Sequence, residues 1–354
     1  METQIHHLPQ DLITRILLRL PVKSLLRVKA VCKFWRSLIS DPHFAKSHYE
    51  LATPRLVFNT KLGIQTMDLD GWLHSNPISE PINVDFLSTY SYIRIVGSCR
   101  GFLLLESMAN RISHIWLWNP STHVHKRVPT SPFDRNLHCN IYGFGYDSSE
   151  DDYLVVQVPT TLAPLRRLVP VQFFSMRANM WKCIEGINSR PLNLACSDRR
   201  PGLLFNEAIH WVAYDHDKSM DVIIVFDLME KRILEIPHPD PVDLARRLSS
   251  CNLWVYGRFL SLSVKRRDKF EIFVMDNYKA QSSWTKTIVL SLSGICPVCS
   301  TKGGDIVMDG FTKLVKYTDN GEQLEHCEYR GYLESRVPIY IESMLSLPGV
   351  DEQS

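Results

Sequence analysis

The sequence predicts an α+β protein of two domains. A small N-terminal unit of three helices occupies residues 5–50, and an all-β, propeller-like domain of about six blades occupies residues 51–354. Apolar residues in the first part follow a helical spacing. From Arg55 onward, short β-rich segments alternate apolar and polar residues between turn signals. A strand–turn–strand pattern then recurs about every fifty residues, which is typical of propeller blades.

The composition is that of a globular protein without a strong overall charge. Of 354 residues, 45% are hydrophobic and 22% are charged, and the formal net charge is +2. These values exclude a mainly disordered chain and a global field that would attract nucleic acid or membranes. No run approaches the roughly 20 apolar residues of a membrane span, so we expect no membrane partner.

Nine cysteines are spread along the chain. Their odd number, their wide spacing and the absence of a signal-peptide pattern at the start predict free thiols in the cytoplasm or nucleus. Cys296 and Cys299 form a lone CxxC motif without the second pair of a zinc ribbon. We therefore expect ordinary thiols and no metal there.

The first helix is expected over residues 8–20, where apolar residues stand at 12, 13, 16, 17 and 20. Pro9 suits its first position, and Pro21 ends it. These apolar residues cover more of the helix than a cluster of three helices would bury. Either a partner protein covers the remainder, by packing of the helix into a groove, or the rest of this chain does. Periodicity alone leaves both alternatives open.

Two further short helices should follow. Val22 begins the second, and the third contains Trp35, with Cys32 expected in the helical core. Asp41-Pro42 then breaks the pattern, and Phe44 opens a short turn.

The β-region repeats a corner in which a large apolar residue ends one strand and a polar residue opens a turn. The polar corner residues are Asp68, Asn119, Ser175, Asp227, Asp276 and Thr318. Their intervals are 51, 56, 52, 49 and 42 residues, and each unit has room for four strands. In the third unit these would be residues 141–145, 153–158, 171–175 and 181–184. Residues 338–345 form an additional strand-like run that would close the ring. A pair of packed β-sheets is the alternative, but it does not require so regular an interval.

The helical region resembles a known domain. It contains Leu8-Pro9-x-Asp11-Leu12-Ile13-x-x-Ile16-Leu17-x-Arg19-Leu20-Pro21, and later Val31-Cys32-Lys33-x-Trp35-Arg36-x-Leu38-Ile39. This stretch resembles the F-box, in the form common in plants. The resemblance implies a unit that binds the Skp-type adaptor of Skp–cullin–F-box ubiquitin ligases, with Leu8 and Pro9 opening the contact and Trp35 bracing the helices. The expected adaptor-binding residues are Leu8, Pro9, Leu12, Ile13, Ile16, Leu17, Leu20, Pro21, Leu25, Leu26, Val31, Cys32 and Trp35.

The β-region is similar to the F-box-associated, kelch-like interaction domain of plant F-box proteins. The similar segments are Gly101-Phe102-Leu103, Trp118-Asn119-Pro120-Ser121-Thr122, Gly143-Phe144-Gly145-Tyr146-Asp147, Asp151-Asp152-Tyr153, His210-Trp211, Phe226-Asp227 and Ser283-Trp284. True kelch blades carry a glycine pair in each unit, whereas this chain has only Gly303-Gly304. The resemblance therefore implies the architecture and does not set the number of blades.

No catalytic or cofactor motif is found. The chain lacks GxSxG, HExxH and a phosphate-binding Gly-Lys-Ser/Thr pattern. His123 and His125 should alternate on one face of a strand, where ordinary edge positions explain them as well as a metal does. The acidic run from Glu150 to Asp152 is expected to be a solvated turn. We expect a non-catalytic protein without cofactor or metal.

The basic residues of the N-terminal part suggest a binding surface for nucleic acid. Residues 1–50 hold eight basic and four acidic residues, a net charge of +4, which allows a helix-turn-helix hypothesis. However, the helix that would read DNA presents core residues, so we expect no nucleic-acid partner. Target contacts are expected on loops, at residues 131–140, 160–170, 189–201 and 237–250. The candidate target-binding residues in these loops are Arg166, Arg167, Arg199 and Arg200.

These expectations combine into one function. The chain should be the substrate-recognition subunit of a Skp–cullin–F-box ubiquitin ligase, with a cullin and a RING protein joined through the adaptor. The target protein is unknown. The alternative is an F-box interaction protein that acts outside a cullin complex as a structural or regulatory binder.

Overall fold

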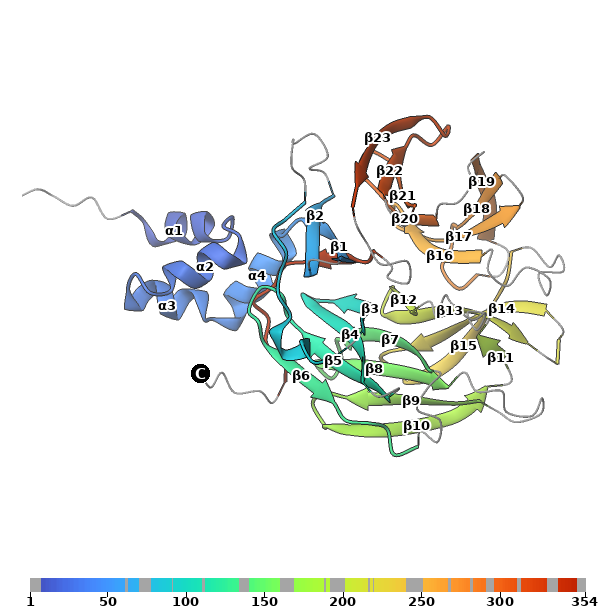
Figure 1. The fold of residues 1–354 in the computed structure, drawn as a ribbon, viewed down its shortest axis with the longest axis horizontal. Coiled ribbons are helices and arrows are strands. Elements are labelled where there is room, and N and C mark those ends of the chain that lie inside the picture. The colour runs from blue at the N-terminus through green and yellow to red at the C-terminus, as the bar shows by residue number, and fades with distance from the viewer. Residues whose placement is uncertain are drawn as a thin grey trace, which may run out of the picture.

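The computed structural model shows a group of helices beside a ring of β-sheets (Figure 1). It describes residues 8–60, 63–69, 78–90, 92–109, 112–133, 140–159, 169–187, 189–191, 201–215, 217, 218, 220–239, 251–266, 269–280, 283–290, 296–310, 313–329 and 337–348. The helices are α1 (Gln10–Leu17), α2 (Val22–Val28), α3 (Lys33–Ile39), α4 (Pro42–Leu51) and a short 3₁₀ turn, η2 (Asp85–Leu87). No helix among these residues is both long and apolar enough to span a membrane.

The N-terminal unit, which we call the helical module, has four short helices where the sequence predicted three and a turn. The fourth, α4, begins where Asp41 accepts a hydrogen bond from the backbone N–H of His43 at 2.7 Å, with Pro42 at the first helical position. It packs back on the module through His48, whose Nε2 donates to the carbonyl of Leu20 at 2.8 Å.

The first half of the β-domain comprises three sheets. A three-stranded sheet joins β2 (Gly63–Asp68), β1 (Pro54–Thr60) and β24 (Ile339–Ile341). The next has β3 (Tyr92–Cys99), β4 (Phe102–Ala109), β5 (Ile112–Trp118) and β6 (His125–Val128). The third has β7 (Asn140–Asp147), β8 (Asp152–Pro159), β9 (Val169–Ser175) and β10 (Met180–Ile187).

The second half comprises a five-stranded and an eight-stranded sheet. The five-stranded sheet has β11 (Ser189–Pro191), β12 (Leu203–Phe205), β13 (Ala208–Asp215), β14 (Met220–Asp227) and β15 (Arg232–Pro237). The eight-stranded sheet joins β16 (Cys251–Tyr256), β17 (Phe259–Arg266), β18 (Lys269–Met275), β19 (Trp284–Leu290), β20 (Cys296–Ser300), β21 (Ile306–Asp309), β22 (Lys313–Tyr317) and β23 (Gln323–Glu328).

The propeller-like architecture is confirmed, although hydrogen bonding groups the described strands into five sheets, fewer than the predicted six blades or so. The eight-stranded sheet is the reason. It contains two successive runs of four antiparallel strands, β16–β19 and β20–β23. A single parallel pairing, of Val255 with Cys299, joins them at β16 and β20. A bond between two inner strands thus makes one sheet out of two repeat units.

The ring closes as the sequence predicted. The late strand β24 pairs antiparallel with β1, so that Tyr340 lies opposite Arg55 and Ile341 opposite Pro54. A strand from the C-terminal end therefore completes the sheet that the first β-strands begin, and Figure 1 shows it in red beside them. Tyr340 is buried in the core between this sheet and the next.

Two of the predicted polar corners, Asn119 and Asp227, form turns capped by their own side chains. The Oδ1 atom of Asn119 accepts from the backbone N–H of Ser121 at 2.9 Å and of Thr122 at 3.3 Å. Asp227 does the same for Met229 and Glu230, both at 3.1 Å. These are Asx turns, in which the side chain replaces a backbone acceptor, so the recurring residue type has a local cause.

Candidate functional site

The helical module leaves an apolar stripe uncovered. Along α1, Leu8, Leu12 and Ile16 are 57%, 43% and 53% exposed. Leu12 and Ile16 are four residues apart on α1, so they lie on one side of the helix, and Leu8 lies two residues before the helix begins. Four further exposed apolar residues of the module are Leu26, Val31, Phe34 and Leu51. Monomeric surfaces rarely keep so many large apolar side chains in so short a segment, which marks an interaction surface.

The structure divides the predicted adaptor-binding residues by burial. Leu17 and Leu25 are buried in the core of the module with Ile39 and Phe44, so they offer no surface to a partner. Half-buried and packed against that core are Ile13, Leu20 and Trp35. The exposed members of the predicted set are Leu8, Pro9, Leu12, Ile16, Pro21, Leu26, Val31 and Cys32. Trp35 thus contacts the core of the module, as expected for a bracing residue.

The prediction that Cys32 lies in the helical core is wrong. Cys32 is exposed and precedes α3, with an extended backbone at φ −157°. Its Sγ accepts a hydrogen bond from the backbone N–H of Trp35 at 3.4 Å. A polarizable sulfur at this position caps the helix, and capping requires a residue outside the helix rather than one packed inside it.

Basic side chains line the module where it faces the propeller. Arg15 and Arg19 border one open cleft of about 710 Å³, and Lys23 and Arg27 border another of about 720 Å³. Arg55 of β1 lies at both clefts. Within the described ranges, no carboxylate forms an ion pair with the four cations of the helices. The apolar stripe therefore belongs to a module with a positive charge.

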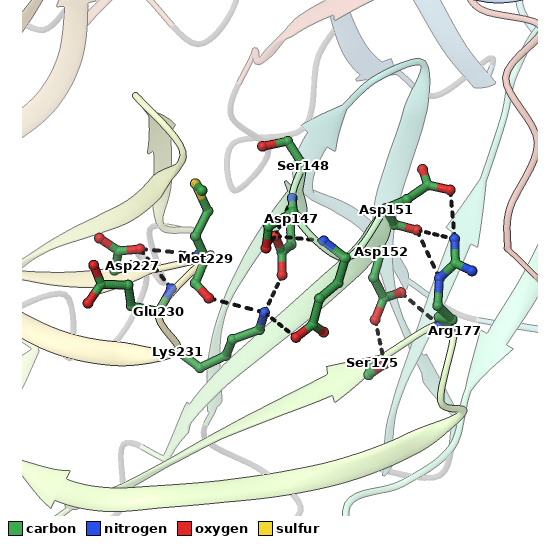
Figure 2. Close-up of polar contacts among 12 residues, drawn as sticks. Asp147, Ser148, Asp151, Asp152, Ser175, Arg177, Asp227, Met229, Glu230 and Lys231 are labelled. Carbon is green, nitrogen blue, oxygen red and sulfur yellow. Dashed lines mark hydrogen bonds and ion pairs between the residues drawn. The ribbon is translucent and has the colours of Figure 1, made fainter.

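A second group of polar residues connects turns of two neighbouring sheets (Figure 2). Lys231, in the β14–β15 turn, forms an ion pair with Asp147 at the end of β7 and reaches Oε1 of Glu150 at 3.3 Å. The neighbouring Arg177 donates from its backbone N–H to Asp152 at 2.7 Å. Its guanidinium lies 2.6 Å from a carboxylate oxygen of Asp151. We call these contacts the turn network.

The turn network shows that the prediction of a solvated acidic turn is only partly right, and its carboxylates stabilise the structure. Asp152 is buried and also accepts a hydrogen bond from Ser175, so the acidic run is not wholly solvated. Burial alone would raise the pKa of Asp147, but hydrogen bonds from Lys231 and Ser149 lower it below its usual value. Both buried carboxylates are thus committed to partners within the chain, which suits them to holding turns rather than to acid–base catalysis.

The centre of the ring holds a mostly apolar cavity of about 220 Å³. His210 and Trp211, which belong to the predicted family motif, lie at its wall with Trp254. His210 donates through Nδ1 to the carbonyl of Leu203 at 3.2 Å, so its Nε2 accepts from the hydroxyl of Tyr278 at 2.9 Å. Burial lowers the pKa of His210 to about 4, which keeps the ring neutral at pH 7. Both ring nitrogens of His210 therefore have hydrogen-bond partners within the chain, and the residue forms part of the cavity wall.

The expected metal candidates do not come together in the described parts of the chain. No group of three or more His, Cys, Asp or Glu side chains there has the geometry to hold a metal ion. His123 lies in a turn with φ 61°, and His125 stacks on Phe86 at 4.0 Å, so the two do not share a strand face. Every described cysteine is a free thiol, and burial raises the pKa of Cys299 to about 12.

The predicted target-binding arginines Arg166, Arg167, Arg199 and Arg200 lie outside the described residues, as do most of the four predicted loops. The strands flanking three of these loops are described. They begin or end at Val128, Asn140, Pro159, Val169, Pro237 and Cys251. In antiparallel blades these positions share one end, opposite to the turns that follow Asp147 and Asp227. The fourth loop falls between β11 and β12, which both pair with β13.

The helical module lies at the end of the ring opposite to these three loops. Its last helix continues through residues 52 and 53 into β1 at Pro54, which pairs with Ile341 at the end of β24. Tyr49 of α4 also lies near Arg100 in the β3–β4 turn, with the guanidinium carbon 5.7 Å from the ring centroid. Figure 1 shows the helices at this side of the ring.

Two family profiles match the chain. The F-box domain matches residues 5–47, and the F-box associated beta propeller domain matches residues 57–336. An F-box/kelch-repeat protein of Arabidopsis thaliana is 30% identical over 307 residues, covering 82% of this chain and 80% of the relative. F-box protein CPR1 of the same plant is 25% identical, covering 80% and 73%. A chain from the solved nidogen/laminin complex aligns with a TM-score of 0.49 at 10% identity, covering 82% and 99%.

Proposed function

Because the chain belongs to the F-box proteins with an F-box associated beta propeller domain, we propose that it is the substrate-recognition subunit of a Skp–cullin–F-box ubiquitin ligase. The helical module binds a Skp-type adaptor, which joins the chain to a cullin and a RING protein. The propeller holds a target protein. The chain contributes no reacting group, and it promotes transfer by holding target lysines near the charged ubiquitin-conjugating enzyme.

The exposed stripe of α1 is the observation that supports adaptor binding. Leu12 and Ile16 lie on one side of α1 and Leu8 lies just before it, and full burial of each such side chain contributes about 1.5–3 kcal/mol. A stripe with four-residue spacing fits a groove on a partner protein. The net positive charge of residues 1–50 favours an adaptor that carries acidic residues.

Adaptor binding is tested by removing the stripe without touching the core of the module. Leu12→Ala with Ile16→Ala should weaken binding of a Skp-type adaptor roughly 30-fold or more, which corresponds to about 2 kcal/mol. The matched control is Leu324→Ala with Met229→Ala, which removes two comparably exposed side chains from the propeller. Calorimetric titration of both full-length variants measures the difference. Equal affinity of the stripe variant and the control would contradict adaptor binding by α1.

Ligase activity requires its own assay. The complex is reconstituted with adaptor, cullin, RING protein, activating enzyme and conjugating enzyme, and ubiquitin transfer to this chain or to a captured target is followed. Transfer that is lost in the Leu12→Ala, Ile16→Ala variant supports the proposed role. Adaptor binding without any transfer would instead indicate a binder that acts outside a cullin complex.

We place target binding at the end of the ring opposite to the helical module. This end is bordered by Asn140, Pro159 and Cys251, and it lies away from the surface assigned to the adaptor. A target bound at this end does not block the adaptor surface, so the chain can bind both proteins at the same time, as a bridging subunit must. The compartment, cytoplasm or nucleus, stays a prediction from the free thiols.

A further inference from the structure

The chain continues past the closing strand along the border between the two modules. We call residues 342–347 the C-terminal strap. The Glu342 carboxylate accepts a hydrogen bond from the backbone N–H of Val22, the first residue of α2, at 3.4 Å. The backbone carbonyl of the following residue, Ser343, accepts a hydrogen bond from the side-chain amide of Asn119, which is buried, at 2.9 Å. Successive residues of the strap therefore bond to the helical module and to the β3–β6 sheet.

The strap also contributes side chains to two separate cores. Met344 packs against the core of the helical module, which contains Leu17 and Phe44. Three residues later, Leu347 is 2% exposed in the core shared by the β3–β6 and β7–β10 sheets. Neither core is complete without the strap. One short segment thus packs on both modules at once.

Gly101 shows how closely the strap lies on the propeller. A Cβ atom at this position would come within 2.0 Å of the Cβ atom of Ser343. The backbone of Gly101 also has φ +83°, a region that glycine adopts readily and other residues seldom do. The β3–β4 turn is thus shaped to let the strap pass without a gap.

Arg100, beside this glycine, makes a second connection between the modules. Its guanidinium carbon lies 3.9 Å from the ring centroid of Tyr146 on β7 and 5.7 Å from that of Tyr49 on α4. Both distances are within the range of cation–π attraction. Arg100 has φ 48°, an unfavourable backbone conformation for an arginine.

We propose that the C-terminal strap and Arg100 form a joint that holds the helical module in one orientation on the propeller. The strap connects the modules by hydrogen bonds and apolar packing. Arg100 connects them at a different point, by cation–π contacts with two tyrosine rings. Two separated points of attachment resist rotation, whereas residues 52 and 53 alone would act as a pivot. This role goes beyond the proposed function, because the joint fixes the relative orientation of the two modules whichever partner each module binds.

The test measures the distance between the modules in the full chain. Spin labels are introduced through encoded unnatural amino acids at the exposed Lys33 of α3 and Lys302 of the β20–β21 turn, which avoids the native cysteines. Electron–electron double resonance should give one narrow distance distribution for the unmodified chain. In the variant with Arg100→Gly and Met344→Ala, the width of the distribution should increase roughly two-fold or more.

Matched controls separate loosening of the joint from general damage. Asn206→Gly with Met180→Ala removes a residue of φ 48° and an exposed methionine, both on the propeller and outside the joint. This control should keep the narrow distribution. Arg100→Gly alone relieves its backbone strain, so it keeps the chain folded even if the double variant unfolds, and it should still widen the distribution. An unchanged width in Arg100→Gly, or equal widening in the control, would overturn the proposal.

Discussion

A buried carboxylate at a turn shows how single residues stabilise this fold. Asp147 has a fully buried side chain, and its Oδ1 accepts from the backbone N–H of Ser149 at 2.8 Å and of Glu150 at 3.3 Å. Its other oxygen pairs with Lys231 from the neighbouring sheet. The charge therefore holds its own turn and also connects two blades.

We predict that Asp147→Asn destabilises the protein by about 1–3 kcal/mol at pH 7, because Lys231 loses its buried charged partner. The folded pKa of Asp147 lies below its usual 3.8, so the stabilisation is present above pH 3.8 and is lost as pH falls through the folded pKa. The difference in unfolding free energy between the two proteins should therefore shrink below pH 4. Urea unfolding at pH 7 and at pH 3 to 4 measures it.

Asp151→Asn is the control for this prediction. Asp151 pairs with Arg177, but both side chains are exposed, so the loss should be about 0–1 kcal/mol. A loss for Asp147→Asn as small as that of the control would contradict a stabilising role of the buried pair.

At the residue scale, recurrence in the sequence was informative and isolated residues were not. Polar corners such as Asn119 and Asp227 could be predicted because the same local chemistry repeats. The cap role of Cys32 and the burial of Asp152 could not. Cys32 falls one position before a helix whose start is set by local capping, and Asp152 is buried by Ser175 and Arg177 from another strand pair.

At the scale of elements, the closing strand β24 is the one on which the ring depends. It contributes few backbone pairings, but Tyr340 fills a core between two sheets and bonds the hydroxyl of Ser121 at 2.8 Å. A short strand can hold this position because its side chain supplies most of the burial.

We predict that Tyr340→Ala destabilises the protein by about 3–5 kcal/mol, the usual loss for a large aromatic side chain in a core. Removal of the ring leaves a cavity between β1 and the β3–β6 sheet, so the first and last strands should separate before the other blades unfold. Thermal unfolding followed by calorimetry, with hydrogen exchange of β1, measures both effects.

Tyr340→Phe isolates the hydroxyl. It keeps the ring in the core and loses only the bond to Ser121, for an expected loss of about 1 kcal/mol. Equal losses for Ala and Phe would mean that the hydroxyl, and not packing, holds the closing strand.

Elements with a strong period could be predicted more closely than those stabilised by packing. The four strands expected in the third unit match β7, β8, β9 and β10 within a few residues at each end. The helix α4 was predicted only as a turn because Asp41-Pro42 was interpreted as a break, although an aspartate cap followed by proline also begins a helix. Its stability also comes from burial of Phe44 and His48 against the other helices, which no local pattern records.

At the scale of the whole molecule, both alternatives that periodicity left open for the helices contribute. Met344 covers part of the helical core from within the chain, while the stripe at Leu12 and Ile16 is still exposed. The sequence could not separate these surfaces, because Met344 lies more than three hundred residues away from α1. The division of the chain near residue 50 stays a prediction, and the strap shows that the two parts share a core.

This sharing predicts that residues 1–53 fold poorly alone. A unit of about fifty residues is near the lower limit for an independent core, and this fragment also lacks Met344 and Glu342. We expect the isolated fragment to lose roughly half of the helical circular dichroism that these residues have in the full chain, and to regain it when a Skp-type adaptor is added. Coupled folding costs binding energy, so the adaptor affinity of the fragment should be roughly ten-fold lower than that of the full chain.

Calorimetric titration of the fragment and of the full chain with the same adaptor measures this difference in affinity. Equal affinities, with full helicity of the free fragment, would show that the helical module is independent and that the strap only rests on it.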